Sequence, residues 1–162
     1  MKETKNKILS QPVKADEIEW RVQFSKTFKD KVCVVPYINN RCVMDRFDEA
    51  FGWDGWSNEI TEIEGGYLCK ITVKLGYIEV SKVDGASKTD IEPEKGGISD
   101  AMKRCAVQFG LGRDLYRYPK VYIENNEQKI PSWAYERLED LTNYILENKG
   151  YPQKFVLIKK LK

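Results

Sequence analysis

The clearest helical pattern in the chain lies in residues 96–112. Apolar residues recur there at helical spacing, which is typical of a helix with one buried face; they are Ile98, Ala101, Met102, Cys105, Ala106 and Phe109. Two glycines precede this stripe, Ser99 or Asp100 can cap its start, and Gly110 can end it. The pattern therefore predicts a central amphipathic helix between the glycine pair and Gly110.

The opposite face of this predicted helix is basic and partly apolar. Helical spacing places Asp100, Lys103, Arg104 and Val107 on that face, and Arg113 follows the helix end. A Lys-Arg pair is also common on an ordinary solvent-exposed helix face. Val107 is apolar, however, and a basic face with apolar groups suits a polyanion whose bases also need a surface. The periodicity alone leaves both interpretations open.

Alternating apolar and polar positions predict two groups of strands. The alternation over residues 18–25 and the apolar run 32–35 indicate two strands that pair as a hairpin. Three further runs, 57–63, 67–75 and 77–83, are separated by glycines that favour short turns. They predict an antiparallel meander.

Two more helices and a second hairpin are predicted around these strands. Apolar spacing predicts a short helix over residues 41–51 and a longer amphipathic helix over 132–150. The runs 121–123 and 128–130 flank turn residues and indicate a small hairpin. Together the patterns predict an α+β fold in which an antiparallel β-hairpin and a three-stranded meander pack against the central amphipathic helix.

The two ends of the chain differ in composition from its middle. Residues 1–14 are rich in lysine and poor in apolar residues, which predicts a flexible basic arm. Residues 151–162 form a basic and apolar C-terminal tail. An isolated strand of this kind would be an exposed edge, so we expect the tail to dock on this chain or on a neighbour. Residues 15–150 then form one domain.

Composition excludes several kinds of chemistry. The 162 residues carry a formal net charge of +2 and no histidine, which excludes histidine-based acid–base catalysis and histidine metal ligands. The four cysteines form no Cys-x-x-Cys pair, so we expect reduced thiols in the core of a cytoplasmic protein. No apolar run reaches membrane-spanning length. We expect no metal, no cofactor and no membrane partner.

An acidic stretch keeps an enzymatic alternative open. Asp84, Asp90 and Glu92 could hold Mg²⁺ for phosphodiester cleavage, as in a nuclease. Common restriction-type nucleases also need a lysine two positions after an acidic residue, and no lysine from Lys70 to Lys95 follows this rule. The chain contains no Gly-Lys dipeptide and therefore no P-loop for ATP.

Aromatic residues with glycines or arginines nearby are candidate surfaces for bases. A single strand is held by cations along its phosphates and by rings against its bases. The candidate rings are Trp53, Tyr77, Tyr116 and Tyr118. Rings of this kind more often lie in a hydrophobic core, and that alternative stays open for each of the four.

Three blocks of sequence resemble the signature segments of the Rad52/Rad22 family of single-strand annealing proteins. The blocks are Met44–Trp56, Val83–Ala86 and Gly97–Gly110, and the last is the most specific. The small size of the chain resembles the phage members of the Sak type. The resemblance covers residues 17–118 or so.

This resemblance implies a non-enzymatic function. It implies a phage or prophage protein that binds single-stranded DNA without ATP and anneals complementary strands in homologous recombination and repair. It also implies a homo-oligomeric ring, with DNA in an outer basic groove. A single-strand-binding protein or an exonuclease is a further candidate partner.

The resemblance also assigns candidate DNA-binding residues. Lys103 and Arg104 match the family's contacts directly. Arg41 matches an arginine at the start of the short helix if one residue is inserted before Phe51, and Arg46 competes for that role. The basic face adds Arg113 and Val107 to the predicted site.

Overall fold

The computed structural model describes residues 2–161, which form two compact units. The first unit contains residues 2–11 and 38–113, and the second contains residues 12–37 and 114–161. The single domain predicted over residues 15–150 therefore does not match the observed division. Each unit combines segments that lie far apart in the sequence.

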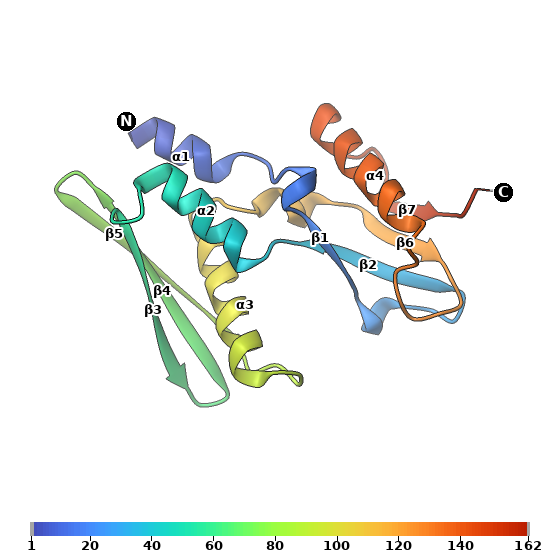
Figure 1. Ribbon diagram of the computed structural model, residues 1–162, viewed down its shortest axis with the longest axis horizontal. Coiled ribbons are helices and arrows are strands. Elements are labelled where there is room, and N and C mark those ends of the chain that lie inside the picture. The colour runs from blue at the N-terminus through green and yellow to red at the C-terminus, as the bar shows by residue number, and fades with distance from the viewer. Residues whose placement is uncertain (1, 162) are drawn as a thin grey trace. The chain divides into compact units, whose positions relative to one another are not determined.

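The first unit contains the predicted meander and the central helix. Strands β3 (Trp56–Ile63), β4 (Gly66–Leu75) and β5 (Ile78–Ser87) form an antiparallel sheet in the order β3-β4-β5. Helix α3 (Pro93–Gln108) packs against β4 and β5 and lies along one face of this sheet (Figure 1). Alternate residues of β4 are buried on that face: Tyr67, Cys69, Ile71 and Val73. Four of the six apolar positions predicted for α3 are also buried: Ala101, Met102, Cys105 and Ala106. The meander and its packing against the central helix are confirmed.

Helix α3 begins earlier than the sequence predicted. It starts at Pro93, so the glycine pair lies inside the helix and does not precede it. A Cβ added at Gly97 would stand 2.7 Å from the Tyr67 ring, and one at Gly96 would stand 2.2 Å from the Thr89 hydroxyl. Glycine thus allows the first turns of α3 to approach the sheet closely.

Two helices complete the first unit. Helix α2 (Asn40–Phe51) begins one residue before its predicted start, and the side chain of Asn39 caps it by accepting a hydrogen bond of 3.0 Å from the backbone N–H of Cys42. Helix α1 (Lys2–Ser10) packs against α2. The prediction of a flexible arm over residues 1–14 is therefore wrong for the described residues, because Leu9 and Val13 are both buried.

The second unit is a four-stranded sheet covered by one helix. Its strands β1 (Glu19–Val22), β2 (Lys31–Tyr37), β6 (Lys120–Glu124) and β7 (Phe155–Ile158) lie in the order β1-β2-β6-β7, and only β6 and β7 pair in parallel. Helix α4 (Ala134–Asn148) packs on one face of this sheet. Short 3-10 helices lie at Ala15–Glu17 (η1), Phe24–Lys26 (η2) and Arg113–Arg117 (η3).

The second unit corrects two predictions and confirms another. The β1–β2 hairpin exists, but it belongs to the unit of α4 and not to that of α3, because Val32 and Val34 share a core with Leu138. Residues 128–130 form no strand, and β6 pairs instead with β2 and β7. The tail docks on this chain, since β7 pairs with β6, and this is one of the two predicted alternatives, the other being a neighbouring chain.

Two further sequence predictions concern the whole chain. All four cysteines are buried free thiols, as predicted. Within residues 2–161, no helix combines the length and the apolar character that crossing a membrane requires.

Candidate nucleic-acid interface

Helix α3 presents the predicted Lys-Arg pair, and each cation has a carboxylate partner. The Nζ of Lys103 lies 3.0 Å from Oδ1 of Asp100, one turn earlier on the helix, and the Lys103 side chain is 21% exposed. The Nε of Arg104 lies 3.3 Å from Oδ1 of Asp84 on β5, and the Arg104 side chain is 57% exposed. The ion pairs therefore hold both cations close to the helix surface, with Arg104 the more accessible of the two.

Asp84 organises the junction between β5 and α3. Its Oδ1 accepts a hydrogen bond of 2.7 Å from the N–H of Gly85, and its Oδ2 accepts one of 3.4 Å from the side-chain amide of Gln108. Burial acts to raise the pKa of Asp84, but these hydrogen bonds and the Arg104 guanidinium outweigh it and lower the pKa below its ordinary value. Asp84 is thus ionised at neutral pH and forms an ion pair with Arg104.

Cations gather at the carboxyl end of α3. The Nε and Nη2 of Arg113 donate hydrogen bonds of 2.7 and 2.8 Å to the carbonyl oxygens of Val107 and Gln108. Lys82 on β5 donates a bond of 2.8 Å to the same Gln108 carbonyl. These bonds satisfy carbonyls that a helix end leaves without partners. Arg113 therefore has a structural role at the helix end, although its side chain is exposed.

The two candidate arginines of α2 lie in different environments. Arg46 is 3% exposed, and its Nη1 donates a hydrogen bond of 3.1 Å to the carbonyl oxygen of Ile8 in α1. The prediction of Arg46 as a DNA contact is therefore wrong, because no phosphate can reach it in this structure. Arg41 is exposed on the first turn of α2 and remains a candidate.

The candidate aromatic residues also differ in exposure. Trp53 is 82% exposed and Tyr77 is fully exposed, and both lie in turns beside the meander. The N–H of Lys74 donates a 2.9 Å hydrogen bond to Gly55, which brings the chain after Trp53 beside the end of β4. Tyr118 is half-buried and its ring lies 6.2 Å from that of Trp20, as expected for a core residue.

The carboxylates of the nuclease alternative do not form a cluster. Strand β5 extends to Ser87, so Asp84 belongs to the sheet, whereas Asp90 and Glu92 lie in the connection to α3. Oε2 of Glu92 lies 3.2 Å from Nζ of Lys95. Among the described residues, no three acidic, cysteine or histidine side chains are placed to share a metal ion.

Comparison with known proteins identifies the family. The model of the Rad52/22 family double-strand break repair protein matches residues 2–133, which include all of α2, the meander and α3. The chain belongs to this family. The family resemblance seen in the sequence is confirmed, and the narrower resemblance to phage members stays a prediction.

Three relatives of this Rad52/Rad22-family chain match different shares of it and of their own length. The single-stranded DNA-binding protein DdrA of Deinococcus deserti is 34% identical over 138 residues, which are 79% of this chain and 68% of that protein. The DdrA of Deinococcus radiodurans is 30% identical over 138 residues, 79% of this chain and 66% of that protein. The DNA repair and recombination protein rad22 of Schizosaccharomyces pombe is 24% identical over 126 residues, 63% of this chain but only 27% of that protein.

Proposed function

We propose that this protein binds single-stranded DNA and anneals complementary strands, without ATP, in homologous recombination and repair. The observation that carries the proposal is the Lys103–Arg104 pair on α3, inside the segment that matches the family model. The names of its DdrA relatives, single-stranded DNA-binding proteins, support single-stranded DNA as the ligand.

The geometry of α3 suits a phosphate chain. The guanidinium of Arg104 is planar and can donate two parallel hydrogen bonds to one phosphate, whereas the Lys103 ammonium acts as a point charge. Each phosphate that the protein neutralises releases counterions from the DNA, so binding weakens as salt rises. Arg41 on α2 would add a further phosphate contact from a second element of the same unit.

Annealing of this kind needs no chemical fuel. Stacking contributes about 1.4 kcal/mol for each base-pair step, so pairing two complementary strands is favourable by itself. The protein has to reduce the repulsion between the strands and to remove their secondary structure. We infer that it does so as a homo-oligomeric ring, in which repeated copies of α3 hold the backbone of one strand and leave its base edges free.

The proposal is tested by annealing two labelled complementary oligonucleotides in the absence of nucleotide. Wild type is expected to accelerate annealing, and Lys103→Ala/Arg104→Ala is expected to lose the acceleration. For the double variant, the slope of log binding constant against log salt concentration is expected to be shallower by about 1.4 per subunit, because each single-strand phosphate contact contributes roughly 0.7.

A matched control separates this site from total charge. Lys7→Ala/Lys70→Ala also removes two ion-paired cations from the first unit, and neither of them lies on α3. It is expected to anneal at nearly the wild-type rate. If Lys103→Ala/Arg104→Ala keeps wild-type affinity and oligomeric state, the assignment to α3 is wrong.

A further inference from the structure

The sheet of the second unit has one face that α4 does not cover. Alternate residues of its strands, such as Val32 and Ile123, point into the core beneath α4. On this sheet, a shallow hollow of about 300 Å³ is lined by Phe28, Lys31, Tyr122, Phe155, Val156 and Leu157. We call this the open sheet face.

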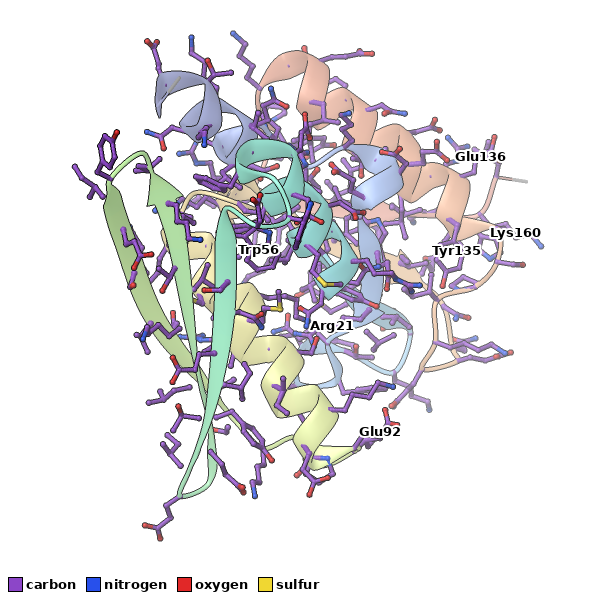
Figure 2. All side chains as sticks on the ribbon, turned by 60° about the vertical axis from the view of Figure 1, so that its left-hand side comes forward. Arg21, Trp56, Glu92, Tyr135, Glu136 and Lys160 are labelled. Carbon is purple, nitrogen blue, oxygen red and sulfur yellow. The ribbon has the colours of Figure 1, made fainter. Side chains whose placement is uncertain are left out.

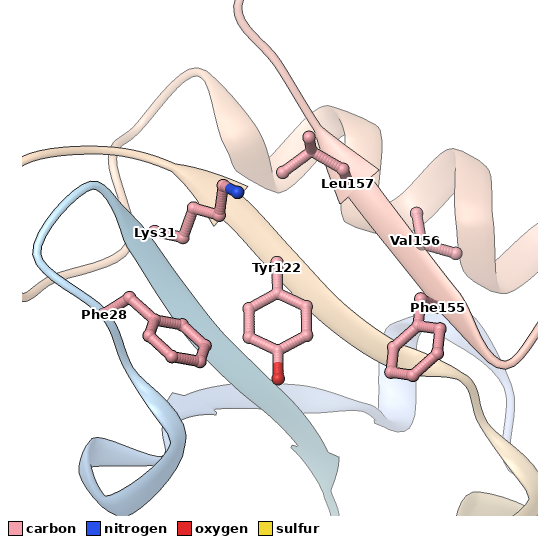
Figure 3. Close-up of a pocket in the computed structure, with 6 residues that line it drawn as sticks. All are labelled: Phe28, Lys31, Tyr122, Phe155, Val156 and Leu157. Carbon is pink, nitrogen blue, oxygen red and sulfur yellow. The ribbon is translucent and has the colours of Figure 1, made fainter.

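Three aromatic rings lie in a row across the open sheet face. Phe28 precedes β2, Tyr122 lies on β6 and Phe155 on β7, and Figure 3 shows the three rings side by side above the strands. Phe28 is 60% and Phe155 57% exposed, and the ring centroids of Phe28 and Tyr122 are 6.0 Å apart. Exposed rings gathered on neighbouring strands are typical of a binding surface.

Cations surround these rings. Lys31 lines the hollow, and Nζ of Lys120 lies 5.9 Å from the centre of the Phe155 ring. Strand β7 also has Lys154 directly before it and Lys159 directly after it. The acidic Glu124 lies opposite Lys31 in the β2–β6 register, and its Oε1 lies 3.6 Å from the Nζ of Lys159, which offsets its charge.

We propose that the open sheet face is a second binding surface for single-stranded DNA, separate from α3. Rings in a row offer stacking platforms to successive bases, and the surrounding lysines offer contacts to phosphates. The identity of the ligand rests on the proposed function. A two-fold dimer through this face is disfavoured, because it would bring the lysines of two equivalent faces together.

The test removes rings while keeping apolar volume. Tyr122→Leu/Phe155→Leu is compared with Tyr135→Leu, which removes an exposed ring from α4 (labelled in Figure 2). Affinity for a fluorescein-labelled oligothymidine is measured in wild type and in Lys103→Ala/Arg104→Ala. In both backgrounds the sheet variant is expected to bind at least about fivefold more weakly for each ring removed, and the α4 control is expected to bind unchanged.

Photocrosslinking locates the DNA independently of affinity. An oligonucleotide containing 5-bromodeoxyuridine is expected to crosslink to peptides that contain Tyr122 or Phe155. If the leucine variants fail to fold, Lys31→Ala/Lys120→Ala provides the second measurement, because both lysines lie beside the rings, and its salt slope is expected to be lower by about 1.4.

The two proposals fail in different ways. If wild type binds DNA, but the sheet variants bind equally well and crosslinks occur only on α3, the second surface is wrong and the proposed function stands. If wild type binds no single-stranded DNA at all, both proposals are wrong.

Discussion

Replacing Asp84 with asparagine is expected to strengthen binding of single-stranded DNA. In the structure, Asp84 occupies the guanidinium of Arg104 and adds a negative charge beside it. Asparagine keeps an oxygen that can accept the 2.7 Å hydrogen bond from Gly85 N–H, so the junction between β5 and α3 retains this contact. Because Arg104 donates to the same Oδ1, the substitution leaves at most a neutral hydrogen bond there and removes the charge that holds the guanidinium. Gln108 loses its 3.4 Å bond to Oδ2 but keeps its 2.6 Å bond to the carbonyl oxygen of Val83.

The size of this effect follows from the exposure of the pair. The Arg104 side chain is 57% and the Asp84 side chain 27% exposed, and a solvent-accessible ion pair of this kind contributes about 0–1 kcal/mol. Releasing Arg104 is therefore expected to tighten binding by up to about fivefold at low salt. If Arg104 then gains a complete phosphate contact, the salt slope steepens by about 0.7 per subunit.

Fluorescence anisotropy of a labelled oligothymidine over a salt series measures both quantities. Glu59→Gln is the matched control, because Glu59 is also an ion-paired acid of the meander but its partner is Lys70, at 3.2 Å. The effect of Asp84→Asn is expected to vanish in an Arg104→Ala background, as a double-mutant cycle for coupled residues requires. Equal effects of Asp84→Asn and Glu59→Gln would show that net charge, and not the release of Arg104, controls affinity.

Two further predictions concern the framework of the site. Gly97→Ala is expected to lower the free energy of unfolding, measured by urea denaturation, by up to about 2 kcal/mol. Overpacking against the buried Tyr67 ring outweighs the gain of about 1 kcal/mol in helix propensity. A variant more stable than wild type would contradict this. Arg46→Ala is expected to destabilise the fold by about 1–3 kcal/mol, because it removes the donor that bonds the Ile8 carbonyl oxygen. Arg41→Ala is expected to leave stability unchanged but to reduce the salt slope of DNA binding by about 0.7. The opposite pattern in melting and binding curves would reverse the roles of the two arginines.

Local patterns in the sequence predicted the elements better than their packing. Helical spacing located α3 and its buried face, and glycine-separated runs located the meander. The partners of the β1–β2 hairpin could not be predicted in this way, since they come from β6 and α4, about 90 residues or more further along the chain. The position of the glycine pair inside α3 depends on Tyr67 and Thr89, which only the folded chain places beside it.

The candidate site shows the same division between local and distant information. Arg46 could have been excluded from the sequence, because Cys42, Arg46 and Ala50 are spaced four residues apart and share the buried stripe of α2. The role of Asp84 could not, since its carboxylate meets Arg104 only when β5 packs against α3. The proposed site therefore has two determinants: cations that the periodicity of α3 reveals, and an opposing carboxylate that the sheet supplies. If α3 binds DNA as proposed, the DNA has to displace that carboxylate from Arg104, so the sheet sets the affinity of the site as well as the helix.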